Sequence, residues 1–276
     1  MPAVARTAIG PVVILAVDQR ETRPLLWDGW AERVLPTAAR LVVACARWRP
    51  VRRALFLATE RKARGLWAGV LCRKRYVDER VAEALDLGAE AVLVLGAGLD
   101  PLGLRLCAVP VFEVDFPAVL ARRPAPADAD EIAVPADLEA RDLVATLERH
   151  AYRGGLRTVV VWEGVTQYLT AESMRATLAD LSSAAPGSAL VFTYIRRDFL
   201  DGARYYGAER AHRAFVRRGR WRFGLHPEQV AAFLAEYGWL EVEQVGAAEH
   251  TARFLVPAGR ELPVTDIERC VYAVKV

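Results

Sequence analysis

A glycine-rich turn and an acidic pair are the residues of this chain best suited to bind a ligand. Residues 91–95 are an apolar run that ends in Gly96-Ala97-Gly98, and the next strand-like segment ends in Glu113-Val114-Asp115. A strand that breaks into a Gly-x-Gly turn lets a ligand approach the backbone, and an acidic residue ending the next strand can bind a ribose diol. Asp115 lies 17 residues beyond Gly98, close to the spacing of about 20 for such a carboxylate. The pattern predicts a nucleotide-type cofactor, and a tight turn without a ligand is the alternative.

The residues that follow this turn distinguish between cofactors. A dinucleotide site has a third glycine where this chain has Pro101, and Asp100 would place negative charge against a pyrophosphate. S-adenosylmethionine carries no phosphate, and acidic residues around its pocket favour the sulfonium. We therefore expect S-adenosylmethionine as the cofactor. An NAD(P)-dependent oxidoreductase is the alternative, although the chain has no Tyr-x-x-x-Lys pair.

Several stretches along the chain carry a family resemblance. In order they are Arg73-Lys74-Arg75-Tyr76-Val77-Asp78, the glycine turn from Leu95 to Asp100 with Arg105-Leu106, Phe112-Glu113-Val114-Asp115-Phe116-Pro117, Asp137-Leu138, the segment from Trp162 to Thr170, and Gly187-Ser188. The sequence resembles the leucine carboxyl methyltransferase family, which includes bacterial polyketide carboxyl O-methyltransferases. Two departures are Pro101, where relatives usually have Thr, and Asp28-Gly29-Trp30, which replaces an Asp-Pro-aromatic sequence.

The order of the predicted elements gives the fold class. Strands are predicted at 91–95, 110–115, 131–134, 157–162 and 188–194, and helices at 101–107, 116–122, 139–149 and 171–184. Such alternation indicates an α/β protein with a parallel sheet covered on both faces. Segments 240–245 and 270–276 complete the Rossmann-like seven-stranded methyltransferase sheet that the resemblance implies, mostly parallel with an antiparallel last strand.

The flanking segments complete the predicted architecture. We expect a single domain over residues 1–276, with a helical N-terminal cap (1–89), a Rossmann-like core (90–276) and a lid inserted at about 196–226. Within the first third, helices are predicted at 30–48 and 78–87, the latter stopped by Gly88, and a buried helix contains the apolar run 12–17. Another helix is predicted at 227–237, and Thr170 is expected to cap the helix that follows it.

The resemblance and the chemistry of the side chains suggest how the cofactor is held. Arg73 matches the family arginine that binds the cofactor's carboxylate, for which a planar guanidinium is suited; the alternative is a surface arginine. Gly96, Ala97 and Gly98 would let backbone amides approach the methionine portion. Asp115 would accept the ribose hydroxyls.

Three further acidic positions and one leucine belong to the same predicted site. Glu113 would assist or orient Asp115. Asp137, with Leu138 beside it, matches the family position that meets the adenine, and its alternative role is a helix N-cap. Glu163 ends the fourth strand, where it could meet the cofactor's ammonium group.

The predicted reaction transfers a methyl group to an oxygen atom of a small molecule. A carboxylate acceptor is already ionised at neutral pH and needs no general base, whereas a hydroxyl acceptor needs one, with His226 and His250 as candidates. Tyr168 and Tyr194 lie near strand ends and could line the acceptor pocket or fill the core. No catalytic residue is assigned among Tyr168, Tyr194 and His226.

The segment from 196 to 223 interleaves nine arginines with six aromatic residues. We interpret it as a lid in which Arg204, Tyr205 and Arg217 bind the substrate, which predicts an anionic, partly apolar acceptor. A solvated amphipathic helix is the alternative, since charge runs usually face water.

The composition argues against other function classes. A net charge of +3 over 276 residues gives no support for nucleic-acid or membrane binding, and the run 12–17 is far shorter than the roughly 20 residues needed to span a bilayer. Cys45, Cys72, Cys107 and Cys270 are scattered, which indicates no disulfide framework, no metal site and a cytoplasmic location. The oligomeric state is not indicated, and a binding protein without catalysis remains an alternative.

Overall fold

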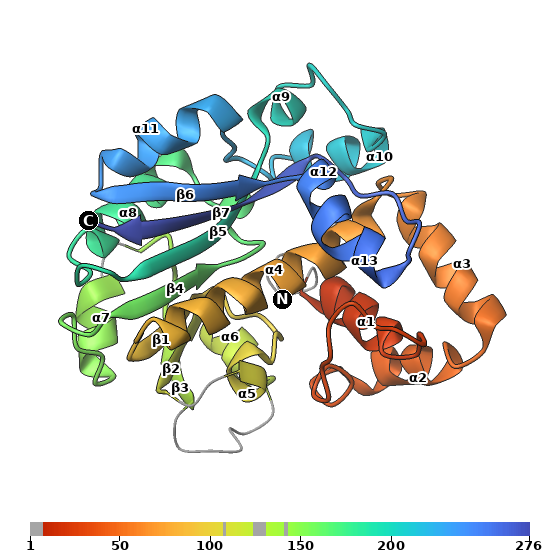
Figure 1. The fold of residues 1–276 in the computed structure, drawn as a ribbon, viewed down its shortest axis with the longest axis horizontal. Helices are drawn as coiled ribbons and strands as arrows, with labels where there is room; N and C mark the ends of the chain where they lie inside the picture. Colours follow the sequence, from red (N-terminus) through yellow and green to blue (C-terminus); the bar gives the residue numbers. More distant parts are fainter. Residues whose placement is uncertain (1–7, 107–108, 124–130, 141–142) are drawn as a thin grey trace.

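The computed structural model describes residues 8–106, 109–123, 131–140 and 143–276, and its centre is one seven-stranded sheet (Figure 1). The strands are β1 (Ala91–Leu95), β2 (Val111–Asp115), β3 (Glu131–Pro135), β4 (Thr158–Trp162), β5 (Ala189–Ile195), β6 (Trp239–Val245) and β7 (Glu268–Lys275). Their order is β3-β2-β1-β4-β5-β7-β6. The first five strands pair in parallel, and β7 runs antiparallel to both β5 and β6. The predicted α/β class and its antiparallel last strand are confirmed.

Thirteen α-helical segments surround the sheet in the described part of the chain. They are α1 (Ile9–Asp18), α2 (Thr37–Cys45), α3 (Arg49–Glu60), α4 (Leu66–Asp86), α5 (Leu102–Leu106), α6 (Pro117–Leu120), α7 (Leu143–Arg149), α8 (Ala171–Leu181), α9 (Arg197–Leu200), α10 (Glu209–Ala211), α11 (Val230–Ala235), α12 (Ala247–His250) and α13 (Val256–Ala258). Short 3₁₀ turns η2 (Thr166–Tyr168) and η4 (Pro227–Gln229) and π turns η3 (His212–Val216) and η5 (Thr251–Leu255) join them. None of the described helices is both long and apolar enough to cross a membrane.

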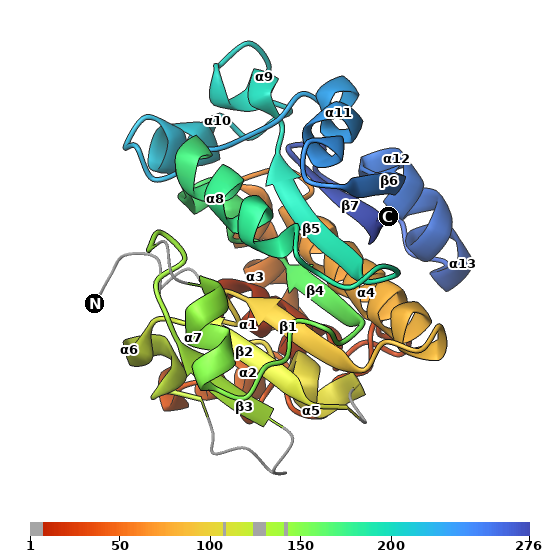
Figure 2. The ribbon, with the colours of Figure 1, turned by 90° about the vertical axis from the view of Figure 1, so that its left-hand side faces the viewer.

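Helices cover both faces of the sheet because the central strands are apolar on both sides. Val92 and Val94 of β1 pack with α1, α2 and α4 in one core, and Leu93 and Leu95 pack with α7, α8 and α11 in the other. Figure 2 shows α7 and α8 on one side of the sheet and α4 on the other. Alternate side chains of a strand point to opposite faces, so a strand buried as completely as β1 must be apolar throughout.

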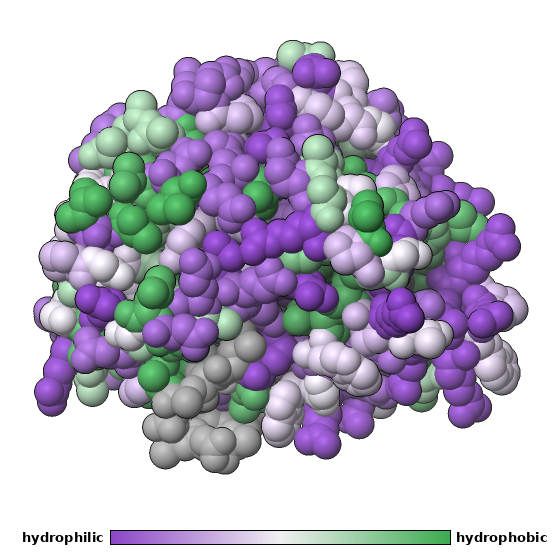
Figure 3. All heavy atoms as spheres, in the orientation of Figure 1, coloured by the Kyte–Doolittle hydropathy of each residue, from purple (hydrophilic) through white to green (hydrophobic). Residues whose placement is uncertain are grey.

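The far edge of the sheet differs from its centre. Only the end residues of β6, Trp239 and Val245, are buried, and Leu240 and Val242 are each 56% exposed. Figure 3 shows hydrophobic residues gathered over this edge on the face that is seen in Figure 1. These exposed apolar side chains depart from the usual pattern of antiparallel edges, in which the solvated face is polar.

Most predicted elements are close to the observed ones. Each of the five strands predicted between residues 91 and 194 begins and ends within one residue of its prediction. The run 12–17 lies within α1 as expected, Gly88 follows α4 with a φ of +90°, and the Thr170 side chain caps α8 by accepting a hydrogen bond from Ser173 N.

The predicted helix over 30–48 is wrong. Residues 30–36 form turns, because the Asp28 carboxylate accepts hydrogen bonds from Trp30 N and Ala31 N and Pro36 then precedes α2. The start of the predicted helix 139–149 differs too: Asp137 closes a turn with Glu139 and Ala140, and α7 begins at Leu143.

The segment between β5 and η4 contains α9, α10 and η3 and returns beside the end of β5, where Arg196 bridges to Leu225. Its buried side chains Phe199, Ala208 and Ala211 pack on Ala63, from the turn between α3 and α4. The segment therefore joins the carboxyl edge of the sheet to the N-terminal helices.

Candidate functional site

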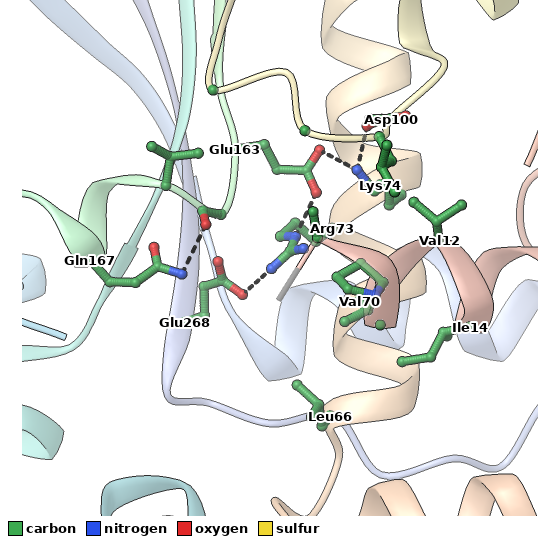
Figure 4. A pocket seen from close by; sticks show the side chains of 18 of the residues that line it. Val12, Ile14, Leu66, Val70, Arg73, Lys74, Asp100, Glu163, Gln167 and Glu268 are labelled. Atoms are coloured by element: carbon green, nitrogen blue, oxygen red, sulfur yellow. Dashed lines mark hydrogen bonds and ion pairs between the residues drawn. The ribbon is translucent and has the colours of Figure 1, made fainter. Parts of the chain in front are cut away.

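A cavity of about 580 Å³ lies at the carboxyl ends of the central strands, between the sheet and α1, α3 and α4. Its wall comes from six parts of the chain: the N-terminal helices, the glycine turn (Gly96 to Asp100), the end of β2 with α6 (Asp115 to Val119), the end of β4 with η2 (Glu163 to Tyr168), the segment after β5, and the start of β7 with the residues before it (Thr265 to Glu268). Figure 4 shows polar residues on one side of it and Val12, Ile14, Leu66 and Val70 on another. The carboxyl edge is where open α/β sheets bind ligands.

The glycine turn allows close backbone approach. Gly96 and Gly98 have φ of +74° and +57°, and a Cβ on Gly96 would lie 2.4 Å from Val165 Cγ2. Asp115 fixes the turn, since its carboxylate accepts hydrogen bonds from Gly98 N at 2.8 Å and Phe116 N at 2.7 Å. Burial raises the pKa of Asp115, although these two hydrogen bonds oppose the shift. Gly96, Ala97, Gly98 and Asp115 all line the cavity.

Five ionisable residues form a charged cluster in the cavity wall: Arg73, Lys74, Asp100, Glu163 and Glu268. Arg73 donates from Nε to Glu163 Oε1 and from Nη1 to Glu268 Oε2, each at 2.6 Å. Lys74 Nζ donates to Glu163 Oε2 at 3.1 Å and to Asp100 Oδ2. These side chains are 6 to 14% exposed, and Figure 4 shows them converging on one side of the cavity.

Mutual attraction favours the charged forms of Lys74 and Asp100. Burial alone would lower the pKa of Lys74, but Asp100 and Glu163 outweigh it and raise that pKa. Burial alone would raise the pKa of Asp100, but Lys74 and Arg105 hold it well below its ordinary value. With all five groups ionised, the charged cluster carries one net negative charge.

Arg105 of α5 connects the charged cluster to the N-terminal region. Its guanidinium pairs with both Asp78 oxygens at 2.7 Å and with Asp28 at 2.7 Å, and it lies 3.3 Å from Asp100. Burial raises the pKa of Asp78 to about 6 against the effect of Arg105. The departure Asp28-Gly29-Trp30 thus keeps the acid that anchors Arg105.

Glu113 lies behind the glycine turn and not in the cavity wall that is described. Its Oε1 accepts a hydrogen bond from Arg123 Nη2, and Arg123 Nη1 donates to the carbonyl oxygens of Gly98 at 3.2 Å and Asp100 at 3.0 Å. Burial, with Glu131 and Asp100 nearby, raises the pKa of Glu113 to about 7 despite Arg123. Sequence reasoning missed Arg123, because nothing in its local sequence indicates that it holds this turn.

Several predicted residues lie outside the described cavity wall. Leu138 packs in the core that contains α7 and α8, and Asp137 accepts a hydrogen bond from Glu139 N at 2.9 Å. Tyr194 is fully buried, burial raises its pKa, and its hydroxyl donates to Gln244. Tyr194 therefore fills the core, whereas Tyr168 lines the cavity.

The histidines that were candidates for a general base are also elsewhere. His226 precedes η4, with Nδ1 3.9 Å from Glu228. His250 is buried, its Nε2 lies 3.6 Å from Cys270 Sγ, and burial lowers its pKa to about 4. No histidine lines the cavity within the residues that the structure describes.

The three predicted substrate-binding residues of the 196–226 segment face away from the cavity wall. Arg204, Tyr205 and Arg217 are exposed, with Arg204 over the ring of Tyr206 and Tyr205 against His212. Ala211, Phe215 and Trp221 line the cavity in their place. The physical reason is solvation: guanidinium groups stay in water, while the stacked Phe215 and Trp221 rings are half-buried and line the cavity.

Two buried acceptor atoms of the cavity wall have no partner among the described residues: Gln167 Oε1 and Glu268 Oε1. Gln167 donates from Nε2 to Gly164 O at 3.0 Å, which fixes the amide. Buried polar atoms without partners are uncommon unless a ligand or water satisfies them. Together with the net negative charge and the glycine turn, they fit a cofactor that carries ammonium and sulfonium groups, whereas the described residues contain no group of acids, histidines or cysteines placed to hold a metal ion.

Similar proteins point to the same cofactor. The family model for leucine carboxyl methyltransferase matches residues 8–182. A relative from Frankia alni is 35% identical over 204 residues, which are 69% of this chain and 69% of the relative, and one from Mycolicibacterium smegmatis is 28% identical over 290 residues, or 93% and 87%. Both are named "Putative S-adenosyl-L-methionine-dependent methyltransferase".

Solved structures share the fold. A DUF574 family protein from Streptomyces avermitilis has a TM-score of 0.60 at 16% identity, over 83% of this chain and 92% of that chain. A "putative methyltransferase" from Thermobifida fusca has a TM-score of 0.55 at 21% identity, over 88% and 96%. The match over residues 8–182 and the relatives show that this chain belongs to the leucine carboxyl methyltransferase family and is an S-adenosylmethionine-dependent methyltransferase.

Proposed function

We propose that this enzyme methylates a carboxylate of a small-molecule acceptor and uses no general base. The observation that carries the proposal is the absence of a histidine from the cavity wall that is described. A hydroxyl acceptor would have to lose its proton during transfer, whereas a carboxylate with an ordinary pKa near 4 is already ionised at neutral pH. The acids of the wall are all in ion pairs or hydrogen bonds: Glu163 and Asp100 pair with Lys74, and Asp115 accepts two backbone hydrogen bonds. Glu268 pairs with Arg73 through Oε2, and we assign its Oε1, which has no partner among the described residues, to the ammonium group of the cofactor.

The same proposal assigns residues to the cofactor. When bound, S-adenosylmethionine supplies a methyl carbon activated by a sulfonium. Arg73 would bind its carboxylate, Glu163 and Glu268 would accept hydrogen bonds from its ammonium group, and Asp115 would bind the ribose hydroxyls. The net negative charge of the charged cluster favours the positively charged methyl donor over a product that has lost the sulfonium charge.

Positioning then supplies most of the rate enhancement. Holding two reactants in line can contribute up to roughly 7–11 kcal/mol. Gly96 and Gly98 would set the depth of the cofactor, and Tyr168 and Gln167 border the space beside it. Asp137 and Leu138 are left out of this assignment, because they lie outside the described wall.

We also propose the domain organisation expected above, one methyltransferase domain with residues 1–89 as a cap and 196–226 as a lid. Its support is that α1, α3 and the segment after β5 contribute to the same cavity as the sheet. A cytoplasmic location is proposed from the unpaired cysteines Cys45, Cys72 and Cys270.

The chemistry of the product tests the proposed function. The purified enzyme is incubated with methyl-labelled S-adenosylmethionine and a small-molecule extract, and the labelled product is treated with alkali. A carboxyl methyl ester releases its label as volatile methanol, and a methyl ether keeps it. Release of the label supports carboxyl methylation, whereas a labelled product that is stable in alkali refutes it and favours a hydroxyl acceptor.

A further inference from the structure

One part of the cavity wall is mostly apolar. It is formed by α1, the α3–α4 region and the segment after β5, and we call it the acceptor chamber. Its defining residues are Val13, Leu55, Lys62, Leu66, Phe215 and Trp221. It adjoins the charged cluster through α4, which carries Leu66, Val70 and Arg73 at successive turns (Figure 4).

Helix α3 lies over the acceptor chamber and is only partly packed, with its apolar side chains against the core that contains α1 and α4. The helix is amphipathic, but none of its residues is buried, and its apolar side chains Val51, Leu55 and Phe56 are half-buried. An amphipathic helix normally buries its apolar face against a partner. Because Leu55 lines the cavity, an apolar ligand in the chamber would complete the burial of this face.

Lys62 gives the acceptor chamber its charge. Lysines occur at only three positions of the chain, and Lys62 and Lys74 both line the cavity. Among the cations of the described wall, Arg73 and Lys74 are paired with carboxylates, while the Lys62 side chain has no ion pair or hydrogen bond within the described residues.

The backbone around Lys62 is held in place. The Glu60 carboxylate accepts hydrogen bonds from Gly65 N at 2.7 Å and Trp67 N at 3.3 Å, and Arg64 N donates to Gly207 O at 3.3 Å. The turn from 61 to 65 is therefore fixed between α4 and the segment after β5. A cation on a fixed turn, beside an apolar wall, is suited to bind the acid group of an apolar molecule.

We infer that the acceptor chamber binds a small carboxylic acid with an apolar body, and that Lys62 pairs with its carboxylate. This inference rests on the proposed function and names its substrate class. It assigns recognition of the acid to Lys62, which is exposed but lines the cavity, and not to Arg204 and Arg217, which are exposed and do not line it. The apolar body, which Leu55, Phe215 and Trp221 would enclose, supplies the remaining affinity through burial of apolar surface.

Binding of decanoate and of its neutral analogue decanamide tests this inference. Both are titrated by calorimetry into the enzyme loaded with S-adenosylhomocysteine, so that no turnover occurs. We expect decanoate to bind more tightly than decanamide, and Lys62→Gln to weaken decanoate binding about fivefold without changing decanamide binding. A fivefold change corresponds to about 1 kcal/mol, the upper value for an ion pair with an exposed partner.

A matched control distinguishes a direct contact between Lys62 and the ligand carboxylate from a general effect of positive charge. Arg61 is exposed on the same turn and does not line the cavity, so Arg61→Gln removes the same charge and should leave decanoate affinity unchanged. Leu55→Asn should weaken the binding of decanoate and of decanamide to the same extent.

Three results would overturn the inference: equal losses in Lys62→Gln and Arg61→Gln, no preference for decanoate over decanamide, or no binding of either. The assay is independent of the proposed function. If decanoate binds through Lys62 but transferred methyl label proves stable in alkali, the carboxyl proposal fails while the acceptor chamber stands.

Discussion

Arg123→Gln tests how the glycine turn is held. Arg123 donates to the carbonyl oxygens of Gly98 and Asp100 on one side and to the buried Glu113 on the other. The substitution leaves Glu113 without its cation and two carbonyl oxygens without a charged donor. Removing one partner of a buried ion pair costs about 3–5 kcal/mol, and protonation of Glu113, whose pKa is already raised to about 7, reduces that cost. We expect a loss of about 3 kcal/mol in the free energy of unfolding.

The effect on cofactor binding should be smaller and separable. Cofactor binding is weakened only to the extent that the glycine turn becomes less well held when its hydrogen bonds from Arg123 are removed. A hydrogen bond from a charged donor is worth about 1.5–3 kcal/mol. We expect a loss of about 1.4 kcal/mol in binding free energy, which raises the dissociation constant of S-adenosylmethionine tenfold. The assays are urea unfolding and isothermal titration calorimetry with S-adenosylmethionine at pH 7.5.

The double variant Glu113→Gln/Arg123→Gln is the control. It removes the unpaired carboxylate, so it should recover about 1–2 kcal/mol of stability, but it cannot restore the contacts to Gly98 and Asp100. Cofactor affinity should therefore remain about tenfold weaker. Wild-type affinity in Arg123→Gln would refute the argument that this side chain shapes the turn.

Three further outcomes are expected. Glu268→Gln makes the charged cluster neutral, so the preference for S-adenosylmethionine over S-adenosylhomocysteine, measured as the ratio of their dissociation constants, should fall about fivefold; an unchanged ratio would contradict the role given to its charge. Gly96→Ala forces a Cβ to 2.4 Å from Val165 at a φ of +74°, so the free energy of unfolding should fall by about 2 kcal/mol and cofactor affinity should fall with it; a stable variant with normal affinity would be inconsistent with the tight turn. Burial raises the pKa of Glu113 from 4.5 to about 7, so the folded protein retains a proton that the unfolded chain has lost, and stability falls as pH rises through this window. We compare the free energy of unfolding of the wild type with that of Glu113→Gln. The wild-type value minus the variant value should decrease between pH 5 and pH 8, and an increase would contradict a raised pKa of Glu113.

The strands and the glycine turn could be predicted because their signals are local. β1 and β4 are short, entirely apolar runs, and burial on both faces of a parallel sheet requires that composition. Gly96 and Gly98 were recognisable because a turn with positive φ favours glycine. The prediction of a helix over 30–48 was wrong because Pro36 and the turn at Asp28 override an amphipathic pattern.

The partners of the site residues could not be predicted, because they depend on contacts between distant parts of the chain. Glu268 is 195 residues from Arg73 in sequence and lies beyond the segment that matches the family. Arg123 is recognisable only once its contacts with the glycine turn are seen. In the segment after β5, arginines and aromatic residues alternate so closely that sequence alone does not show which of them face the cavity. The structure places Arg204 and Arg217 on the exposed side and Phe215 and Trp221 in the cavity wall.

The claim on which the other assignments depend is that the cofactor occupies this cavity with its amino-acid end at the charged cluster. A crystal structure of the enzyme with S-adenosylhomocysteine tests it most directly. We predict that the ligand carboxylate lies within hydrogen-bond distance of Arg73, and that a ribose hydroxyl lies within hydrogen-bond distance of Asp115. A ligand bound away from residues 96–100, or with its adenine at Arg73, would contradict the account.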